Sequence, residues 1–567
     1  MHSDESEIPR MIATKDNRPN GHRLWNKTFK TSFCLFMFFF TFYYFTNAGW
    51  YQGGDSFFMH LVAKQISQKG KLGFDRKQLP ENIDAHEDVW GKGPNGQYYF
   101  KWGLGQSLVE VPFYMLHSLI WKPVTSRNIT ENRVSSALFT ELMTVFLCPS
   151  LISSIGCVLV FLFGLRLGFS RQVSLLLSLI YGIGTMVWPY SKLLMSEVTL
   201  NVALLAGTYG VFSYVSDLKG RWLALSAVCL GFAFMTKVTS VVTIPVVVGY
   251  VLFSVRSRKA VYDFIIFFLP LFLASIGIVL WYNLIRYGDF WQFGYNQGMD
   301  SLGFRTPLYV GLWGLLLSPG KSYFLYTPIS ILGLSSAWAF FKKRRPEALM
   351  FLGICLTFTL LHALWWSWAG DWAWGPRFLL VITPYMILPA GFFFETWRRQ
   401  KSLKKVIVIL LLVFSISIQV LGVSIHPFSF IESRTRIVNQ IVDIRSLTYR
   451  STYSESAFVN FSPMFSHIIG NWWLFKHMFF SYDIWSDVPW QVLGFSNSKP
   501  PTWMKGNRTI PFWWPISFSV ISPTDKPWIY SLGAINFLFV LWWGLQMRRQ
   551  FLNDKEPRLI RQPAPVF

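Results

Sequence analysis

Residues 31–48 read TSFCLFMFFFTFYYFTNA, and the chain then reaches Asp55 through Gly53 and Gly54. An uncharged apolar run of about 20 residues can cross a membrane as a helix. Asp55 would then lie just beyond the end of the span, where the falling dielectric constant can tune the pKa of a carboxylate. Polar residues precede the run and no small-residue cleavage site follows it, so we expect a retained signal anchor.

The first polar segment also contains a lysine in a distinctive setting. Residues 98–105 read YYFKWGLG, which places Lys101 among aromatic residues and glycines. A lysine there offers a cation beside backbone that can approach a ligand closely. A carboxylate base and an anion-binding cation at a membrane surface suggest chemistry on a lipid-borne phosphate. Two alternatives stay open: Asp55 as the N-cap of a helix over Ser56–Gln68, and Lys101 as a snorkelling interfacial lysine.

The composition predicts an all-α integral membrane protein. The 567 residues are 52% hydrophobic and 14% charged, whereas soluble domains carry about 25% charged residues. The net charge of +23 comes largely from short basic loops between apolar runs, which favours positive-inside topology over nucleic-acid binding. All five cysteines lie in apolar segments, so we expect neither a disulfide framework nor a cysteine metal site.

Apolar runs predict about twelve transmembrane helices. We place them at 31–48, 137–165, 172–189, 197–215, 221–236, 238–254, 262–284, 323–341, 348–366, 377–396, 405–425 and 527–547. With the N-terminus inside, the basic loops fall on the cytoplasmic side, as does the C-terminus.

This topology divides the chain into four parts. Residues 1–30 form a cytoplasmic tail, and residues 31–425 form a transmembrane domain whose first external loop, 49–136, is the catalytic candidate. Residues 426–526 form an aromatic-rich external loop or lid. Residues 527–567 form the last transmembrane helix and a cytoplasmic tail.

Within the first external loop we expect two amphipathic helices on the membrane surface, over Ser56–Gln68 and Ser107–Trp121. Between them, Asn82–Gly96 is polar and rich in glycine, which predicts a loop.

Three further charged residues lie at expected external helix ends. Glu197 opens a span, either as a second carboxylate of the site or as a helix-start acid favoured by the helix dipole. Lys237 interrupts an apolar stretch, as a functional residue or a structural ion-pair partner. Arg377 follows a Gly-Pro turn and could fork onto a phosphate, although Asp371 could instead hold it in a structural pair.

Other catalytic motifs are absent from the sequence. It contains no phosphate-binding Gly-x-x-x-x-Gly-Lys-Ser/Thr loop, no His-Glu-x-x-His and no Gly-x-Ser-x-Gly. The nine histidines are scattered, so we predict no histidine metal site, and a divalent cation as cofactor stays an open alternative.

Taken together, the ordered motifs resemble the GT-C glycosyltransferases, in the branch of the lipid A aminoarabinose transferase, rhizobial galacturonosyltransferases and protein O-mannosyltransferases. The motifs are Gly54-Asp55, the Tyr99-Phe100-Lys101 segment with its following aromatic helix, Ser196-Glu197, and the Arg-Phe-Leu-Leu-x-x-x-Pro pattern of Arg377–Pro384. The likeness extends over roughly residues 31–400. Ser56 stands where a second acidic residue often follows, and Trp102-Gly103 replaces a frequent Pro-Pro.

The resemblance implies inverting transfer of a sugar from a polyprenyl-phosphate donor to a lipid, glycan or protein acceptor at the external or periplasmic face of the plasma membrane. Asp55 would be the base, Lys101 and Arg377 would hold the donor phosphate, and Tyr99 would support them. The alternatives are a polytopic transporter or lipid flippase and a non-catalytic membrane scaffold. The sequence leaves the sugar and the acceptor open.

Overall fold

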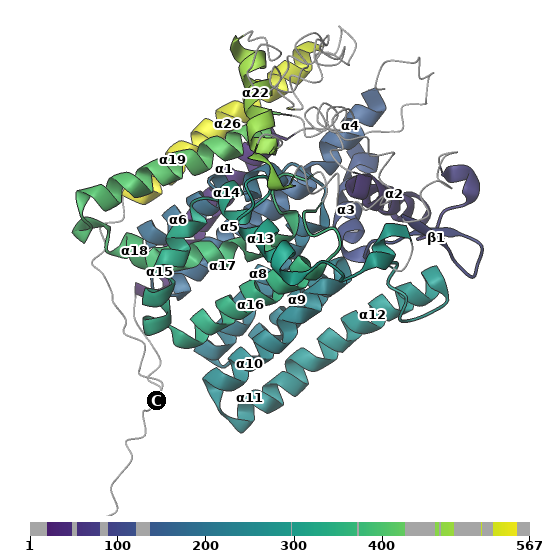
Figure 1. Ribbon diagram of the computed structural model, residues 1–567, viewed down its shortest axis with the longest axis horizontal. Coiled ribbons are helices and arrows are strands. Elements are labelled where there is room, and N and C mark those ends of the chain that lie inside the picture. The colour runs from purple at the N-terminus through teal and green to yellow at the C-terminus, as the bar shows by residue number, and fades with distance from the viewer. Residues whose placement is uncertain are drawn as a thin grey trace, which may run out of the picture.

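The described residues fold mainly into helices, because backbone surrounded by lipid must satisfy its own hydrogen bonds. The computed structural model describes residues 20–47, 54–79, 89–120, 136–295, 298–370, 373–425, 460–463, 466–480, 512 and 526–552. Figure 1 shows long helices lying side by side, with α2, α3 and β1 gathered near one end of α9 and α12.

The elements of the first half run from the N-terminal helix to the long apolar helix α12. They are α1 (Asn20–Phe45), α2 (Gly54–Lys69), η1 (Arg76–Gln78), β1 (Trp90–Lys92), β2 (Tyr98–Phe100), α3 (Leu104–Ile120), α4 (Ser136–Val145), α5 (Leu147–Arg166), α6 (Arg171–Ile183), α7 (Val187–Tyr190), α8 (Ser196–Asp217), α9 (Gly220–Thr236), η3 (Val238–Val242), α10 (Thr243–Val255), α11 (Arg258–Asp263), η4 (Phe264–Phe268) and α12 (Leu269–Tyr287).

The second half continues with several short helical pieces between the long ones. They are η5 (Gly298–Leu302), α13 (Leu308–Leu316), α14 (Tyr323–Tyr326), α15 (Ser330–Lys343), α16 (Arg345–Leu364), η6 (Arg377–Ile382), α17 (Thr383–Ile387), η7 (Leu388–Ala390), α18 (Gly391–Glu395), η8 (Trp397–Arg399), α19 (Ser402–Ser424), α22 (His467–Phe480) and α26 (Lys526–Leu552).

The prediction of a multispan helical membrane protein is confirmed. Among the described residues, eight helices are long and apolar enough to cross a membrane, and they coincide with eight of the expected spans. The shorter apolar helices α6 and α9 lie at two more. The remaining expected spans, 31–48 and 323–341, fall on α1 and on α14 with α15, so the count of twelve stays a prediction.

The segment 49–136, which we expected as the first external loop, contains the two expected helices and an unexpected hairpin among its described residues. α2 and α3 form where amphipathic helices were expected. β1 and β2 pair antiparallel with Trp90 opposite Phe100, so the loop prediction for Asn82–Gly96 is wrong at residues 90–92. Most of the expected lid, 426–526, lies outside the described residues.

Basic residues gather at the end of the helix bundle opposite α2 and α3. Arg166 at the end of α5 binds Asp217 at the end of α8, at 3.0 Å. The guanidinium of Arg344, between α15 and α16, donates to the carbonyl of Leu167 at 3.1 Å. Loops that the positive-inside rule assigns to one face therefore meet in space.

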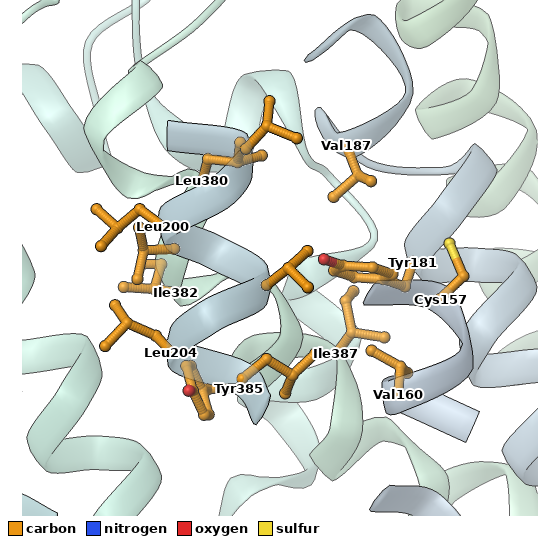
Figure 2. Packing of buried hydrophobic residues seen from close by; sticks show 14 of the residues in the cluster. Cys157, Val160, Tyr181, Val187, Leu200, Leu204, Leu380, Ile382, Tyr385 and Ile387 are labelled. Atoms are coloured by element: carbon orange, nitrogen blue, oxygen red, sulfur yellow. The ribbon is translucent and has the colours of Figure 1, made fainter. Parts of the chain in front are cut away.

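The core combines aliphatic side chains with many buried phenylalanine and tyrosine rings. Figure 2 shows residues of α5, α6, α8 and η6 packed together, including Cys157, Tyr181 and Leu200. The hydroxyl of Tyr181 accepts a hydrogen bond from the amide of Asn201 at 2.7 Å, which satisfies two buried polar groups between α6 and α8.

The crossing of α15 over α17 depends on a glycine. A Cβ atom added to Gly333 would lie 1.6 Å from the carbonyl oxygen of Met386, which is backbone and cannot rotate away. We expect Gly333→Ala to destabilise the protein by about 1–3 kcal/mol or more through overpacking. Gly277→Ala in α12 is the control, because nothing lies within 4 Å of its added Cβ. Thermal unfolding in detergent should show a lower Tm for the first variant alone.

Candidate active site

A cavity of about 360 Å³ collects four charged residues that the sequence singled out. Asp55, Lys101, Lys237 and Arg377 all contribute to its wall. They come from the first turn of α2, the turn between β2 and α3, the corner after α9 and the start of η6. Residues more than 300 positions apart in sequence, Asp55 and Arg377, are in direct contact here.

A chain of ion pairs through Glu197 joins three of these charges, those of Asp55, Arg377 and Lys237. The Nη1 of Arg377 lies 2.9 Å from Oδ2 of Asp55, and its Nε lies 3.7 Å from Oε1 of Glu197. The same carboxylate oxygen of Glu197 accepts a hydrogen bond from Nζ of Lys237 at 2.8 Å. Glu197 is almost fully buried, whereas the side chain of Asp55 is 36% exposed. Of these two carboxylates, Asp55 is the one that lines the cavity and that a molecule there can reach.

Aromatic rings complete the wall beside these cations. The ammonium of Lys237 lies 4.4 Å from the ring centre of Phe378, and the guanidinium of Arg377 lies 5.1 Å from it. The imidazole of His362 stacks on the same ring, with centroids 4.7 Å apart. A cation over an aromatic face is stabilised by the ring quadrupole, which helps to hold two positive charges close together.

Lys101 has its own carboxylate partner. Its Nζ donates a short hydrogen bond to Oδ2 of Asp300, a residue of η5. The other carboxylate oxygen, Oδ1, accepts from the indole nitrogen of Trp366 at 3.1 Å. The charge of Lys101 is thus compensated in the described structure by a residue that the sequence did not single out.

Glycines let the backbone segments of the site approach each other. A Cβ added to Gly103 would lie 2.4 Å from the carbonyl oxygen of Met235, so the segment carrying Lys101 packs directly on the corner before Lys237. Gly370 adopts a φ of +69°, and its added Cβ would lie 2.6 Å from Cγ of Arg377. Glycine suits this position because it tolerates the left-handed backbone and leaves room for the side chain of Arg377.

Arg286 holds the segment of Lys101 from behind. Its Nη1 donates to the carbonyl oxygens of Phe100, Lys101 and Trp102, at 3.0, 2.8 and 3.2 Å. Its Nη2 donates to Oδ1 of Asn283 at 2.7 Å. Arg286 is 3% exposed, so it serves as a structural anchor for three consecutive carbonyl groups rather than as a ligand group of the cavity.

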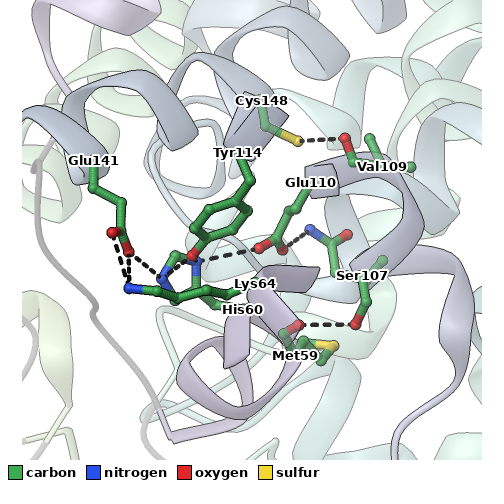
Figure 3. A network of polar contacts seen from close by, with 10 residues as sticks. Met59, His60, Lys64, Ser107, Val109, Glu110, Tyr114, Glu141 and Cys148 are labelled. Atoms are coloured by element: carbon green, nitrogen blue, oxygen red, sulfur yellow. Dashed lines mark hydrogen bonds and ion pairs between the residues drawn. The ribbon is translucent and has the colours of Figure 1, made fainter. Parts of the chain in front are cut away.

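The helix that begins with Asp55 is fixed by a separate polar network, drawn in Figure 3. His60 of α2 contacts Tyr114 and lies 3.6 Å from Oε2 of Glu110, both on α3. Gln106 donates to Glu110 at 2.8 Å and accepts from Thr199 at 2.6 Å. Thr199 belongs to α8, the helix of Glu197. The network therefore ties the helices of both site carboxylates to one another.

Burial sets the protonation of this network. Burial raises the pKa of Glu110 to about 8, which outweighs the hydrogen bond from Gln106. Burial, helped by the charge of Lys64, lowers the pKa of His60 well below its ordinary value. The contact between His60 and Glu110 is therefore one between two neutral groups at neutral pH.

The other predicted site residues fall into three classes. Glu197 pairs with Lys237 and Arg377 of the cavity wall, which fits the ion-pair alternative for Lys237. The hydroxyl of Tyr99 accepts from the amide of Asn95 at 2.7 Å, and Tyr99 is not part of the cavity wall. Asp371 lies outside the described residues. Asp300, in the loop after α12, and Arg286, in the last turn of α12, were missed because their contacts with the Lys101 segment depend on tertiary packing.

The divalent-cation alternative gains no support from the described residues. Within them, no three histidine, cysteine, aspartate or glutamate side chains lie close enough together to hold a metal ion.

Residues 132–282, about a quarter of the chain, match the sequence model of the dolichyl-phosphate-mannose-protein mannosyltransferase family. Over these residues, the predicted resemblance to the protein O-mannosyltransferase branch of the GT-C glycosyltransferases is confirmed. The matched segment contains Glu197 and Lys237, whereas Asp55, Lys101 and Arg377 lie outside it. No curated protein sequence matches this chain.

Two solved GT-C structures show a distant likeness. ArnT from Cupriavidus metallidurans bound to undecaprenyl phosphate is 14% identical, with a TM-score of 0.45 over 80% of this chain and 77% of that chain. The archaeal oligosaccharyltransferase AglB from Archaeoglobus fulgidus, in complex with an inhibitory peptide and a dolichol-phosphate, is 10% identical, with a TM-score of 0.43 over 78% and 60%. These scores are too low to place residues of one chain onto another.

The raised pKa of Glu110 gives a testable pH dependence. The unfolded chain loses this proton near the ordinary value of 4.5, whereas the folded protein keeps it up to about pH 8. Wild-type stability should therefore fall as pH rises through that window and then level off. The side chain of Gln in Glu110→Gln cannot ionise. The Tm of this variant minus that of the wild type should therefore increase between pH 5 and pH 9, when thermal unfolding is followed by intrinsic fluorescence. A Tm difference that is constant with pH would contradict a buried neutral carboxyl.

Proposed function

We propose that this protein is an inverting glycosyltransferase that moves a sugar from a polyprenyl-phosphate donor to a hydroxyl group of a lipid, glycan or protein acceptor. The family resemblance implies both the reaction class and the roles of the residues, and the cavity supports these roles because it brings the residues together. The observation that carries the proposal is the meeting of an accessible carboxylate, Asp55, with Arg377, Lys101 and Lys237 around one cavity.

The proposed chemistry assigns Asp55 as the general base. As the acceptor oxygen attacks the anomeric carbon, its proton passes to the carboxylate of Asp55. The bond between that carbon and the phosphate oxygen breaks on the opposite side, so the configuration inverts. The lipid phosphate leaves with an additional negative charge, and Arg377 and Lys101 stabilise that charge. The buried Glu197 keeps Arg377 and Lys237 at the cavity wall.

The ion pair between Asp55 and Arg377 fits an ordered sequence of events. The guanidinium of Arg377 donates a hydrogen bond to Oδ2 of Asp55, which occupies an oxygen that would otherwise be open to the acceptor hydroxyl. A donor phosphate that binds Arg377 would draw the guanidinium away and free this oxygen. The base would thus become effective once the leaving group is in place.

We further propose that the protein lies in the plasma membrane with both termini in the cytoplasm and the cavity at the external face. The basic loops meet at the end of the bundle away from the cavity, and such loops are retained in the cytoplasm. The same position of the cavity disfavours a transporter or flippase. Transport sites are commonly built near the middle of the bilayer, whereas Glu197, Lys237 and Arg377 all lie at helix ends.

Replacement of the base tests the proposed reaction. Asp55→Asn keeps the shape of the side chain but cannot accept the proton, so kcat for transfer should fall by between about 100-fold and 10,000-fold. Transfer is measured by mass spectrometry of the lipid, glycan or peptide acceptor that changes when the gene is deleted. Asp217→Asn is the matched control, because Asp217 also pairs with an arginine, Arg166, at the other end of the bundle. Full activity of Asp55→Asn would rule out the proposed base.

A further inference from the structure

Asp300 is a buried carboxylate that the proposed reaction does not use. It belongs to the short helix η5 and is 7% exposed, yet it lines the cavity. Both of its oxygens are occupied, one by the ammonium of Lys101 and one by the indole nitrogen of Trp366. A carboxylate fixed from two sides, with its charge compensated, has the rigidity expected of a recognition group rather than of a base.

Aromatic rings surround this fixed pair of charges. The ammonium of Lys101 lies 5.5 Å from the ring centre of Trp102 and 5.8 Å from that of Tyr295. Tyr295 meets the edge of Trp365, with centroids 6.0 Å apart and planes at 87°. Phe304 meets the same indole at 5.2 Å. These rings all line the cavity, so one end of it combines flat apolar surfaces with a hydrogen-bonding acid and base.

A sugar ring presents a matching surface. Its C–H groups form an apolar face that packs on aromatic rings, and its neighbouring hydroxyl groups each donate and accept a hydrogen bond. A carboxylate oxygen accepts from one hydroxyl, and an ammonium donates to the next. Asp300 and Lys101 together can therefore bridge two adjacent hydroxyl groups of a sugar whose face lies on the rings.

We propose that Asp300, Lys101 and Trp366 form the subsite for the sugar of the donor, and that this sugar is neutral. The inference rests on the proposed function. Lys101 then lies at the boundary of the subsite, in reach of both the sugar and the phosphate, while Arg377 and Lys237 serve the phosphate side. One cavity contains both groups, as it must when the sugar is bonded directly to the phosphate.

The charge of the subsite argues for a neutral sugar. A uronic acid would bring its carboxylate beside Asp300, and the nearest cation of the cavity wall, Lys101, is already bound to that aspartate. An amino sugar would bring an ammonium that competes with Lys101 for the same oxygen. A neutral hydroxyl adds to the ion pair without displacing either member, which avoids leaving a buried charge uncompensated.

Binding to lipids with and without a sugar tests the subsite. Purified protein in nanodiscs is titrated with undecaprenyl phosphate and with the same lipid bearing glucose, mannose, galactose or galacturonic acid. The readout is the ratio of Kd for the bare lipid to Kd for each glycosylated lipid. We expect this ratio to exceed one for at least one neutral sugar and not for galacturonic acid. Asp300→Asn should lower the neutral-sugar ratio about tenfold while affinity for the bare lipid holds or rises.

Two more variants separate the possible results. Trp366→Phe keeps an aromatic ring but removes the indole N–H that orients Asp300. The ratio of Kd values for the neutral sugar should therefore fall by less than in Asp300→Asn. Asp289→Asn, an exposed aspartate of the same loop, should leave the ratio unchanged. An unchanged ratio in Asp300→Asn would reduce Asp300 to a counterion of Lys101, and a wild-type preference for galacturonic acid would overturn the neutral class. If the wild type binds neither form of the lipid, the proposed function itself fails.

Discussion

The ion pair between Asp55 and Arg377 connects the proposed general base to a proposed phosphate-binding residue. It joins the first turn of α2, which follows the N-terminal helix, to the start of η6, hundreds of residues later. Such a contact is costly in a low-dielectric environment unless each charge has further partners. Glu197 supplies that partner on the side of Arg377, and Lys237 in turn compensates Glu197. The cavity wall is therefore a charge-balanced unit, not a set of independent residues.

This charge balance requires the surrounding backbone to hold each charged side chain in a defined position. Ion pairs at the membrane surface are maintained only if the backbone segments that carry them are fixed. Arg286 fixes the carbonyl groups around Lys101, Gly103 allows this segment to touch the corner before Lys237, and Gly370 makes room for the side chain of Arg377. None of these three residues touches the proposed reacting atoms. Each determines where a charge lies.

The sequence predicted most of the helices and singled out charged residues that meet in the fold, but it did not predict all of their partners. Apolar runs mark spans because length and hydropathy are local properties, so most of the long helices were found. Asp55, Glu197, Lys237 and Arg377 stood out because charge beside an apolar run is rare, and Lys101 stood out among aromatic residues and glycines. Asp300 did not, since it lies in a long polar loop where an aspartate is unremarkable. Its contact with Lys101 depends on tertiary packing, which no local pattern encodes.

The same dependence on tertiary packing explains the wrong loop prediction at residues 90–92. In the hairpin of β1 and β2, only β1 was predicted as loop, because it is three residues long and lies in a segment rich in glycine and polar residues. The hairpin forms because Arg286 and other residues of α12 give its backbone carbonyls and rings a surface to pack on. Lys101 directly follows β2, and its side chain contacts Asp300 in the loop after α12. The sequence predicted Lys101 as a phosphate-binding cation, but in the folded chain Lys101 is paired with Asp300. This ion pair supplies the hydrogen-bonding groups of the proposed sugar subsite.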